Sequence, residues 1–353
     1  GSGGAGGLSG GTGGGGGGTT KSMGINLHDN VYYSPNTPFV NLAKLISEYK
    51  VGTNDQWETP GATVSENSNG FPTGFSAPVV CNARIDLFEG HPNGTYNFNW
   101  DGPANAVTID GATNGASSGT FTKSSAKQVF LVRLRAGITG LRIWHSSDNI
   151  ATTFRAPFVT KCSKFKILRF MNWANVNFSW TPTWATRKTV NSYTNARKTV
   201  SLTVNSGEMC WDYVYQLCNA AGSAPWICVH HLANDAYVTS LAQLMHANLN
   251  PSLPIYVEHS NETWNGAFDQ RQYCIDMGDG ADTNATRRGF VYHANRTAAI
   301  GNIFKANCPG RTIKTCLGVQ SSGGAGFLAF AWPSVPAGTK NAINVISPAP
   351  YFG

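Results

Sequence analysis

Charged residues are scarce in this chain. Of its 353 residues only 13% are Asp, Glu, Lys or Arg, and the net charge is a modest +7. The basic residues form no stripe interleaved with aromatics, so we expect no nucleic-acid partner. No apolar run approaches the length of about 18 residues that a membrane span requires. Gly, Asn, Ser and Thr supply the polarity instead, a profile that favours a secreted, extracellular protein.

Familiar metal-binding patterns are also missing. The eight cysteines include no C-x-x-C pair, which argues against a zinc ribbon. They are either disulfides of an oxidising compartment or small buried hydrophobes. Neighbouring His230 and His231 would point to opposite faces of a strand, and Glu258-His259 has the reverse order of H-E-x-x-H. The sequence therefore predicts neither a metal ion nor a cofactor.

Glycine dominates the start of the chain. Thirteen of the first 20 residues are Gly, and such a segment cannot bury apolar surface to offset its ordering entropy. We expect residues 1–22 to be a disordered linker. A short apolar strand at 23–27 should open the fold, followed by a helix, because apolar residues recur at helical spacing from Phe39 to Tyr49. Residues 79–150 carry short strands separated by Gly, Asn and Asp turns, which predicts a small all-β insertion.

Strands and helices alternate after residue 150. Strands are expected at 165–171, 225–229, 253–258, 313–319 and 343–347, and helices at 211–221, 237–249 and 290–306. This alternation predicts a parallel sheet. With the first strand it makes six barrel-type strands, so we expect an α/β fold, a (β/α)₈ TIM barrel that stops after about strand six. On this interpretation residues 23–353 are an incomplete catalytic barrel, interrupted by the 79–150 insertion, in a piece of a longer protein.

Polar and aromatic residues follow these strands, at the end where such barrels carry their chemistry. They are His28 and Asn30 after the first strand, Arg169 and Trp173 at the second, His231 after the third, Asn261, Glu262 and Trp264 after the fourth, and Tyr351 after the sixth. Convergence of these side chains on one edge of a sheet predicts a functional site.

The stretch 256–265 ends its strand with the pair Asn261-Glu262, followed by Trp264. It resembles the acid/base signature of clan A glycoside hydrolases, and more closely a group of secreted bacterial proteins related to that clan. Arg169, His231 and Tyr351 are similar to the arginine, histidine and aromatic residue that the clan places on strands two, three and six. The resemblance covers roughly 23–353, apart from the insertion.

The resemblance implies a role for each of these residues. Glu262 would be the acid/base, Asn261 would bind the sugar 2-hydroxyl, and Arg169 would hold the nucleophile ionised, with His231 and Tyr351 positioning it. The clan's nucleophile lies on strand seven, which we expect beyond residue 353. Glu258 is four residues from Glu262, about 13 Å along a strand at ~3.3 Å per residue. The carboxyl groups of a retaining pair are only about 5 Å apart, so Glu258 is expected to lie too far from Glu262 to be the nucleophile.

An aromatic loop follows the second barrel strand. Trp173, Asn175, Trp180 and Trp184 lie within thirteen residues, interleaved with further asparagines. Aromatic faces stack on sugar rings and amides bind hydroxyls, so this loop, with His28, Asn30 and Trp264, is the expected polysaccharide-binding surface. The tryptophans could instead cover the core.

The resemblance implies a retaining glycoside hydrolase acting on a β-linked polysaccharide, such as a glucan or mannan. Two alternatives stay open. The chain could be a non-catalytic carbohydrate-binding or surface-attachment protein, which keeps the aromatic loop without a second carboxylate. It could also be an enzyme whose β insertion is the dominant glycan-binding module. Fold alone does not decide between them.

Overall fold

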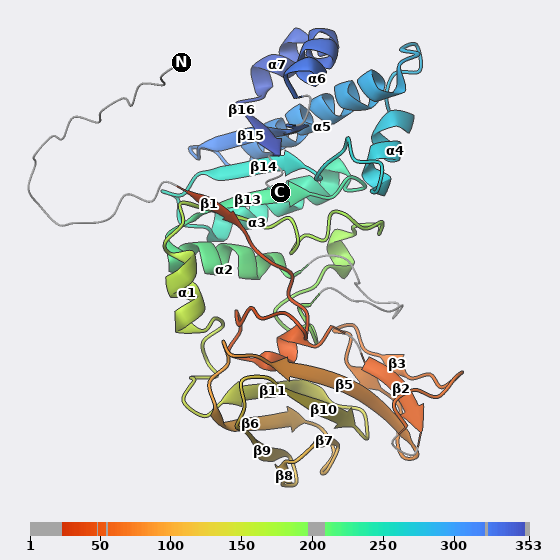
Figure 1. Cartoon of the computed structure of the whole chain (residues 1–353), viewed down its shortest axis with the longest axis vertical. Coiled ribbons are helices and arrows are strands. Elements are labelled where there is room, and N and C mark those ends of the chain that lie inside the picture. Colours follow the sequence, from red (N-terminus) through yellow and green to blue (C-terminus); the bar gives the residue numbers. More distant parts are fainter. Residues whose placement is uncertain (1–22, 48, 54–55, 197–208, 322–323, 350–353) are drawn as a thin grey trace, which may run out of the picture.

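The computed structural model describes residues 23–47, 49–53, 56–196, 209–321 and 324–349. The expected linker, 1–22, and Tyr351 lie outside these residues. Figure 1 shows two regions, one of parallel strands and helices and one of antiparallel strands.

The first region is built on a six-stranded parallel sheet. Its strands are β1 (Gly24–Asn26), β12 (Ile167–Arg169), β13 (Ala224–Val229), β14 (Ile255–His259), β15 (Ile313–Gln320) and β16 (Val345–Ala349). They lie in chain order, each hydrogen-bonded to the next. Central β13 and β14 are almost wholly buried, whereas every residue of β1 is exposed. Such a sheet carries polar loops at its carboxyl edge.

Seven α-helices and three short 3₁₀ turns complete the described chain. They are α1 (Ala156–Cys162), α2 (Trp211–Ala221), α3 (Asp235–Asn248), α4 (Asp269–Asp276), α5 (Ala285–Asn307), α6 (Gly324–Ala331), α7 (Ala337–Ala342), η1 (Leu42–Leu45), η2 (Trp184–Thr186) and η3 (Trp332–Ser334). Side chains of Asn234 and Asn284 accept backbone N–H groups at the starts of α3 and α5, as N-cap residues do. Helices α2, α3 and α5 pack in a row, and α5 lies against β14 and β15.

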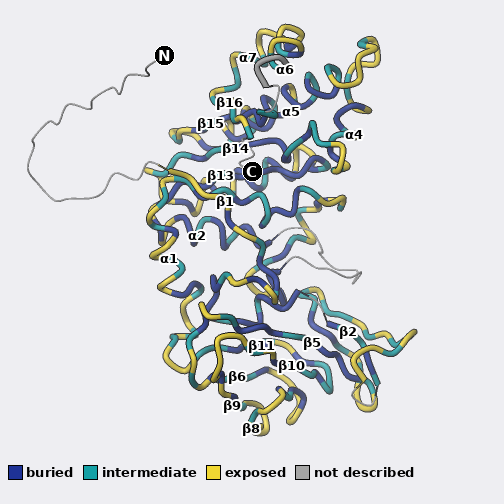
Figure 2. The backbone as a smooth tube through the Cα atoms, viewed as in Figure 1, coloured by how far each residue is buried: buried dark blue, intermediate teal, exposed yellow. Residues whose placement is uncertain are grey.

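The second region consists of antiparallel sheets. One contains β2 (Tyr49–Thr53), β5 (Val79–Leu87), β10 (Gln128–Leu134) and β7 (Val107–Ile109), and the other β11 (Thr139–His145), β6 (Gly94–Asp101), β9 (Ser118–Lys123) and β8 (Thr113–Asn114), beside the pair β3 (Ser65–Glu66) and β4 (Pro72–Thr73). Phe121 of one sheet contacts Phe130 of the other, with ring centroids 4.4 Å apart. The two sheets thus enclose a core of alternate inward side chains, and Figure 2 colours the buried residues dark blue along the backbone.

The structure corrects the expected fold class. The parallel strands form an open sheet, since among the described residues β1 and β16 each pair with one neighbour and not with each other. No closed (β/α)₈ barrel is therefore present in this part of the chain. A small all-β insertion at 79–150 is also wrong, because β2 at Tyr49–Thr53 pairs with β5 and the antiparallel region begins there, as three sheets.

The helix expected from Phe39 to Tyr49 is also wrong. Only the single 3₁₀ turn η1 forms among the described residues of this segment, and Leu42, Ala43, Leu45 and Ile46 are buried while Lys44 is half-buried. The side chain of Asn41 caps this turn and also bonds the backbone of Leu141 and Ile143 in β11. The helical spacing of the apolar residues therefore reflects their burial in a short turn and not one face of a helix.

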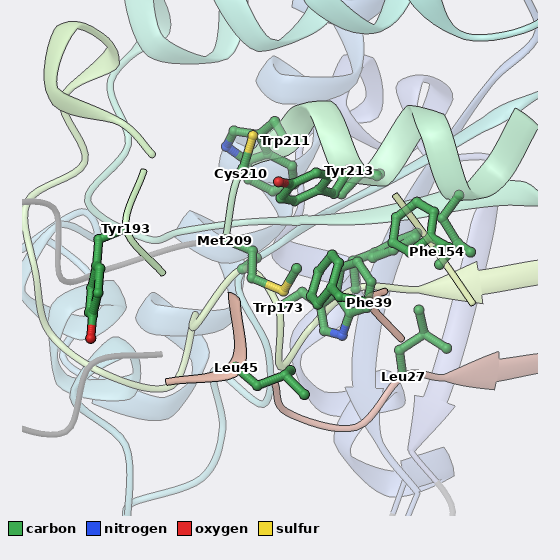
Figure 3. Packing of buried hydrophobic residues seen from close by; sticks show 14 of the residues in the cluster. Leu27, Phe39, Leu45, Phe154, Trp173, Tyr193, Met209, Cys210, Trp211 and Tyr213 are labelled. Atoms are coloured by element: carbon green, nitrogen blue, oxygen red, sulfur yellow. The ribbon is translucent and has the colours of Figure 1, made fainter. Parts of the chain in front are cut away.

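The two regions share one hydrophobic core. Figure 3 shows Phe39 between Phe154 and Trp173, with its ring 5.5 Å from that of Phe154 and 5.0 Å from that of Tyr213. All eight cysteines are buried with free thiols, so in this fold they are small core side chains rather than cross-links.

Candidate functional site

A buried ion pair crosses the centre of the parallel sheet. Arg169, the last residue of β12, reaches over β13 to Glu258 of β14, and its Nε and Nη2 donate to Glu258 Oε2 at 3.1 and 2.8 Å. The indole N–H of Trp226 donates to the same oxygen at 2.8 Å. Burial alone would lower the pKa of Arg169, but Cys228, Glu258 and Glu262 outweigh it and raise that pKa above its ordinary value. The guanidinium of Arg169 is therefore held in its charged form beside Glu258.

The other carboxylate oxygen of Glu258, Oε1, has a different environment. Oε1 accepts no hydrogen bond from the described residues, and it lies against Gly318, where a Cβ would come within 2.7 Å of it and 3.7 Å of the Trp264 ring. Glycine at this position leaves room for the carboxylate and the indole together.

Asn261 connects the ion pair to the loop after β14. Its Oδ1 accepts from Arg169 Nη2 at 3.0 Å, and its Nδ2 donates to Asn177 Oδ1 at 3.0 Å. Gln270 of α4 donates to both Asn177 and the Asn261 carbonyl, at 3.0 and 2.8 Å. One amide network thus joins the start of the loop after β14, the aromatic loop after β12, and α4.

Glu262 lies at the turn of that loop. The strand ends at His259, and Ser260 and Glu262 have left-handed backbones with φ of 57° and 43°. The side chain is half-buried, and its Oε2 accepts from Asn265 Nδ2 at 2.8 Å. An L residue other than Asn or Gly rarely adopts this conformation, which costs roughly 1–2 kcal/mol.

Two cavities flank this loop. One, of about 220 Å³, is lined by Asn172, Asn175, Asn177, Phe178 and Phe268, among others. The second, of about 150 Å³, is lined on the other side by Thr263, Trp264 and Gln320, with residues of α4 and α5. Amide groups beside aromatic rings, as in the first cavity, suit a sugar.

The tryptophans of the aromatic loop differ in their placement. Trp173 is buried in the shared core, and its indole donates to the His28 carbonyl at 3.0 Å, so the sugar contact expected of it is not available. Trp180 is half-buried, donates to the Asn175 carbonyl and lies 4.7 Å from the ring of His230. Trp184 lies between Arg187 and Tyr237, with its ring centroid 4.2 Å from the Arg187 guanidinium carbon.

The residues after β1 are less central than expected. His28 is exposed, whereas Asn30 is buried and donates to the sulfur of Met209. Neither contacts Arg169 or Asn261 among the interactions of the described residues. Asn175 is also buried and has a left-handed backbone with φ of 51°.

Four buried histidines lie beneath the candidate site. His231 stacks on His230 at 4.3 Å, and Nδ1 of His259 lies 3.0 Å from Nδ1 of His293. His293 Nε2 has a carbonyl partner, Gly318 O at 3.2 Å, so His293 Nδ1 accepts from His259 and His259 Nε2 is an acceptor. Burial lowers the pKa of His230 to about 3 and that of His231 and His293 to about 4.

These histidines do not form a metal centre. In the described part of the chain no three His, Cys, Asp or Glu side chains are arranged to hold a metal ion. Hydrogen bonds join His259 to His293 and His230 to the Phe178 carbonyl, whereas the buried Nδ1 of His231 and Nε2 of His259 have no hydrogen-bond partner among the described residues. The positioning role expected of His231 stays a prediction.

Sequence reasoning found Arg169, Asn261 and Glu262 but missed Glu258, Trp226, Asn177 and Gln270. A signal for Glu258 was present, because a lone Glu and a lone Arg on apolar strands of one sheet predict an ion pair, since neither charge can be buried alone. Trp226 reaches the pair because it lies in register with Arg169 on β13, the strand between them.

No protein-family model matches this chain, and none of the curated proteins matches it. A crystal structure of the Podospora anserina GH26-CBM35 β-(1,4)-mannanase aligns over 86% of this chain and 91% of its own, at 9% identity and a TM-score of 0.18. A score that low does not establish a common fold. Separately, no helix of the described residues has the length and apolar character needed to cross a membrane.

Proposed function

We propose that this chain is a retaining glycoside hydrolase acting on a β-linked polysaccharide by double displacement, with Glu262 as the acid/base. The observation that carries the proposal is the setting of Glu262, a half-buried carboxylate on a strained turn directly after Asn261, which Arg169 fixes. Strained backbone persists only where surrounding structure holds it, and it gathers at functional sites. Of the four non-glycine residues with positive φ in the described chain, Asn175, Ser260 and Glu262 lie here.

Each group has a chemical part in this proposal. Glu262 would protonate the glycosidic oxygen and then activate water for the second step. Asn261, oriented by Arg169 and Asn177, would bind the sugar 2-hydroxyl. The resemblance to clan A would place the nucleophile on a seventh strand, and no carboxylate of the described residues is assigned that role. Arg169 Nη1 makes no hydrogen bond within the described residues, so a donor remains for that second carboxylate.

The test is reducing-sugar release from a panel of β-glucans, mannans and xylans, using the protein expressed from its whole reading frame. Glu262→Gln should lower the rate by about 100-fold or more, the contribution of a positioned general acid. Glu58→Gln, which removes an exposed carboxylate paired with Lys50, is the matched control and should keep the wild-type rate. Equal rates for Glu262→Gln and wild type would refute the assignment.

A non-catalytic carbohydrate-binding protein is the second candidate. The observation in its favour is that Glu258, the carboxylate nearest to Glu262 in the sequence, is already occupied by Arg169 and Trp226. Under this alternative no polysaccharide of the panel is cleaved, yet one is retained in affinity electrophoresis, and a Phe178→Ala change at the edge of the amide-lined cavity weakens that retention.

A further inference from the structure

A cavity of about 400 Å³ lies away from the candidate site, where the antiparallel region meets η1 and residues 190–191. Buried Phe71 and Leu141 are among its apolar lining residues. This size lies within the range of pockets that hold small ligands, which combine apolar walls with a few convergent polar groups.

Two cations and one carboxylate line this cavity. Lys44 donates through Nζ to the carbonyl oxygens of Val190, at 3.0 Å, and Ser192. The Arg142 guanidinium donates to Asp101 Oδ2 at 3.0 Å. Since Asp101 balances only one of the two positive charges, the lining carries an excess of one.

The neighbouring groups indicate that a negative charge is missing. Burial, and to a smaller extent the charge of Arg142, lower the pKa of Lys44 to about 8, although Cys210 acts to raise it. An anion held between them would oppose both effects. Asn69 also lines the cavity, and its side-chain amide makes no hydrogen bond with the described residues, so it remains available to a ligand hydroxyl.

We propose that this cavity binds the carboxylate of a uronic-acid unit, with the carboxylate on Lys44 and Arg142 and the ring hydroxyls on Asp101 and Asn69. Charge-assisted hydrogen bonds from two cations would select the acid over a neutral sugar. The apolar face of the ring would rest on Phe71 and Leu141. This site does not depend on the hydrolase proposal, because it shares no residue with the loop that carries Glu262.

The experiment is calorimetric titration of the full chain at low salt with trigalacturonate, its methyl ester and acetate. Trigalacturonate should bind, and the methyl ester, which has the same shape without the charge, should bind at least tenfold more weakly, as expected for loss of charged hydrogen bonds. If acetate binds as tightly as the trimer, the ligand is a free small carboxylate. Either result supports a carboxylate site.

Variants locate the binding. Arg142→Gln should weaken trigalacturonate binding by about tenfold or more, and Arg142→Lys should restore part of it. The matched control is Arg133→Gln, which removes a cation paired with Asp110. Arg133 lies on a different antiparallel sheet from Arg142, so its loss should leave binding unchanged. Should Arg142→Gln unfold, Asn69→Ala tests the same cavity without touching an ion pair. No binding by wild type, or equal binding of acid and ester, would overturn the proposal.

Discussion

Glu258 and Glu262 are four residues apart and have opposite environments. Glu258 is buried under an arginine and an indole donor, whereas Glu262 is half-buried and held by a neutral amide. Glu258 is thus paired with a cation, whereas Glu262 accepts a hydrogen bond from a neutral amide, although its charge still acts on Arg169. This difference in environment supports the proposed division of roles, in which Glu262 transfers the proton and Glu258 holds the strands together.

The Arg169–Glu258 pair gives a direct prediction. Glu258→Gln leaves a largely buried guanidinium without its counter-charge, so we expect a loss of about 3–5 kcal/mol in the free energy of unfolding. Urea denaturation measures it. Replacing both residues by Met should recover most of that loss, since no buried charge is left.

The control is an exposed pair of the same kind. Asp282→Asn breaks the contact with Arg287 at the surface, where ion pairs contribute little, and the denaturation midpoint should stay within error. If Glu258→Gln behaves like this control, the buried pair does not hold the strands β12 and β14 together.

The sequence could predict the site only as far as it could predict the ends of the strands. Arg169, Asn261 and Glu262 were accessible because their order along the chain matches the order of the strands. The position of Glu258 relative to Glu262 could not be predicted, because the expected separation of about 13 Å assumed that the strand continues through residue 262. The strand stops at His259, and two left-handed residues turn the chain; no residue pattern marks that turn.

Among the elements, those of the parallel region were the more predictable, since all six expected strands and three of the expected helices are present. The helix expected at 211–221 is α2, with the bounds Trp211–Ala221, and Gly222 ends it in the left-handed conformation, as a glycine after a helix often does. Strand β2 could not be found locally, because its register is set by pairing with β5, some thirty residues later. Long-range pairing of this kind leaves little trace in one segment.

The packing of α5 on the sheet gives the second prediction. A Cβ on Gly301 would overlap the hydroxyl and methyl groups of Thr315 in β15, so the helix can approach only because this residue is glycine. Gly301→Ala should therefore destabilise the fold by about 1–3 kcal/mol through overpacking. Chemical denaturation monitored by circular dichroism is the measurement.

Gly338 in α7 is the matched control, because a Cβ there would meet no atom within 4 Å. Gly338→Ala should be neutral or stabilise by up to about 1 kcal/mol, from helix propensity alone. Stabilisation by both substitutions would mean that α5 and β15 are not in close contact.

In the molecule as a whole, the shared core joins a parallel and an antiparallel region (Figure 2). The prediction of a closed barrel was wrong because the number of strands and their alternation with helices are the same for an open and a closed sheet. Closure depends on whether the two edge strands pair, which is a property of the assembled sheet and not of any segment.

Buried neutral histidines make stability of the whole fold depend on pH. The pKa of His231 and of His293 is about 4 in the folded state, against about 6.5 in an unfolded chain. The unfolded state therefore binds more protons below that value, and stability rises with pH. We expect the free energy of unfolding to be fully present above about pH 6.5 and to fall by roughly 1.4 kcal/mol per unit for each such histidine as pH drops toward 4.

Urea titrations between pH 7.5 and 4.5 measure that slope. His231→Phe keeps an aromatic ring beside His230 and Tyr273 but cannot bind a proton, so its slope should be shallower by one histidine. His246→Asn, at an exposed position of α3, removes a histidine without touching the cluster and serves as the control. An unchanged slope in His231→Phe would show that burial does not lower the pKa of this histidine in the folded protein.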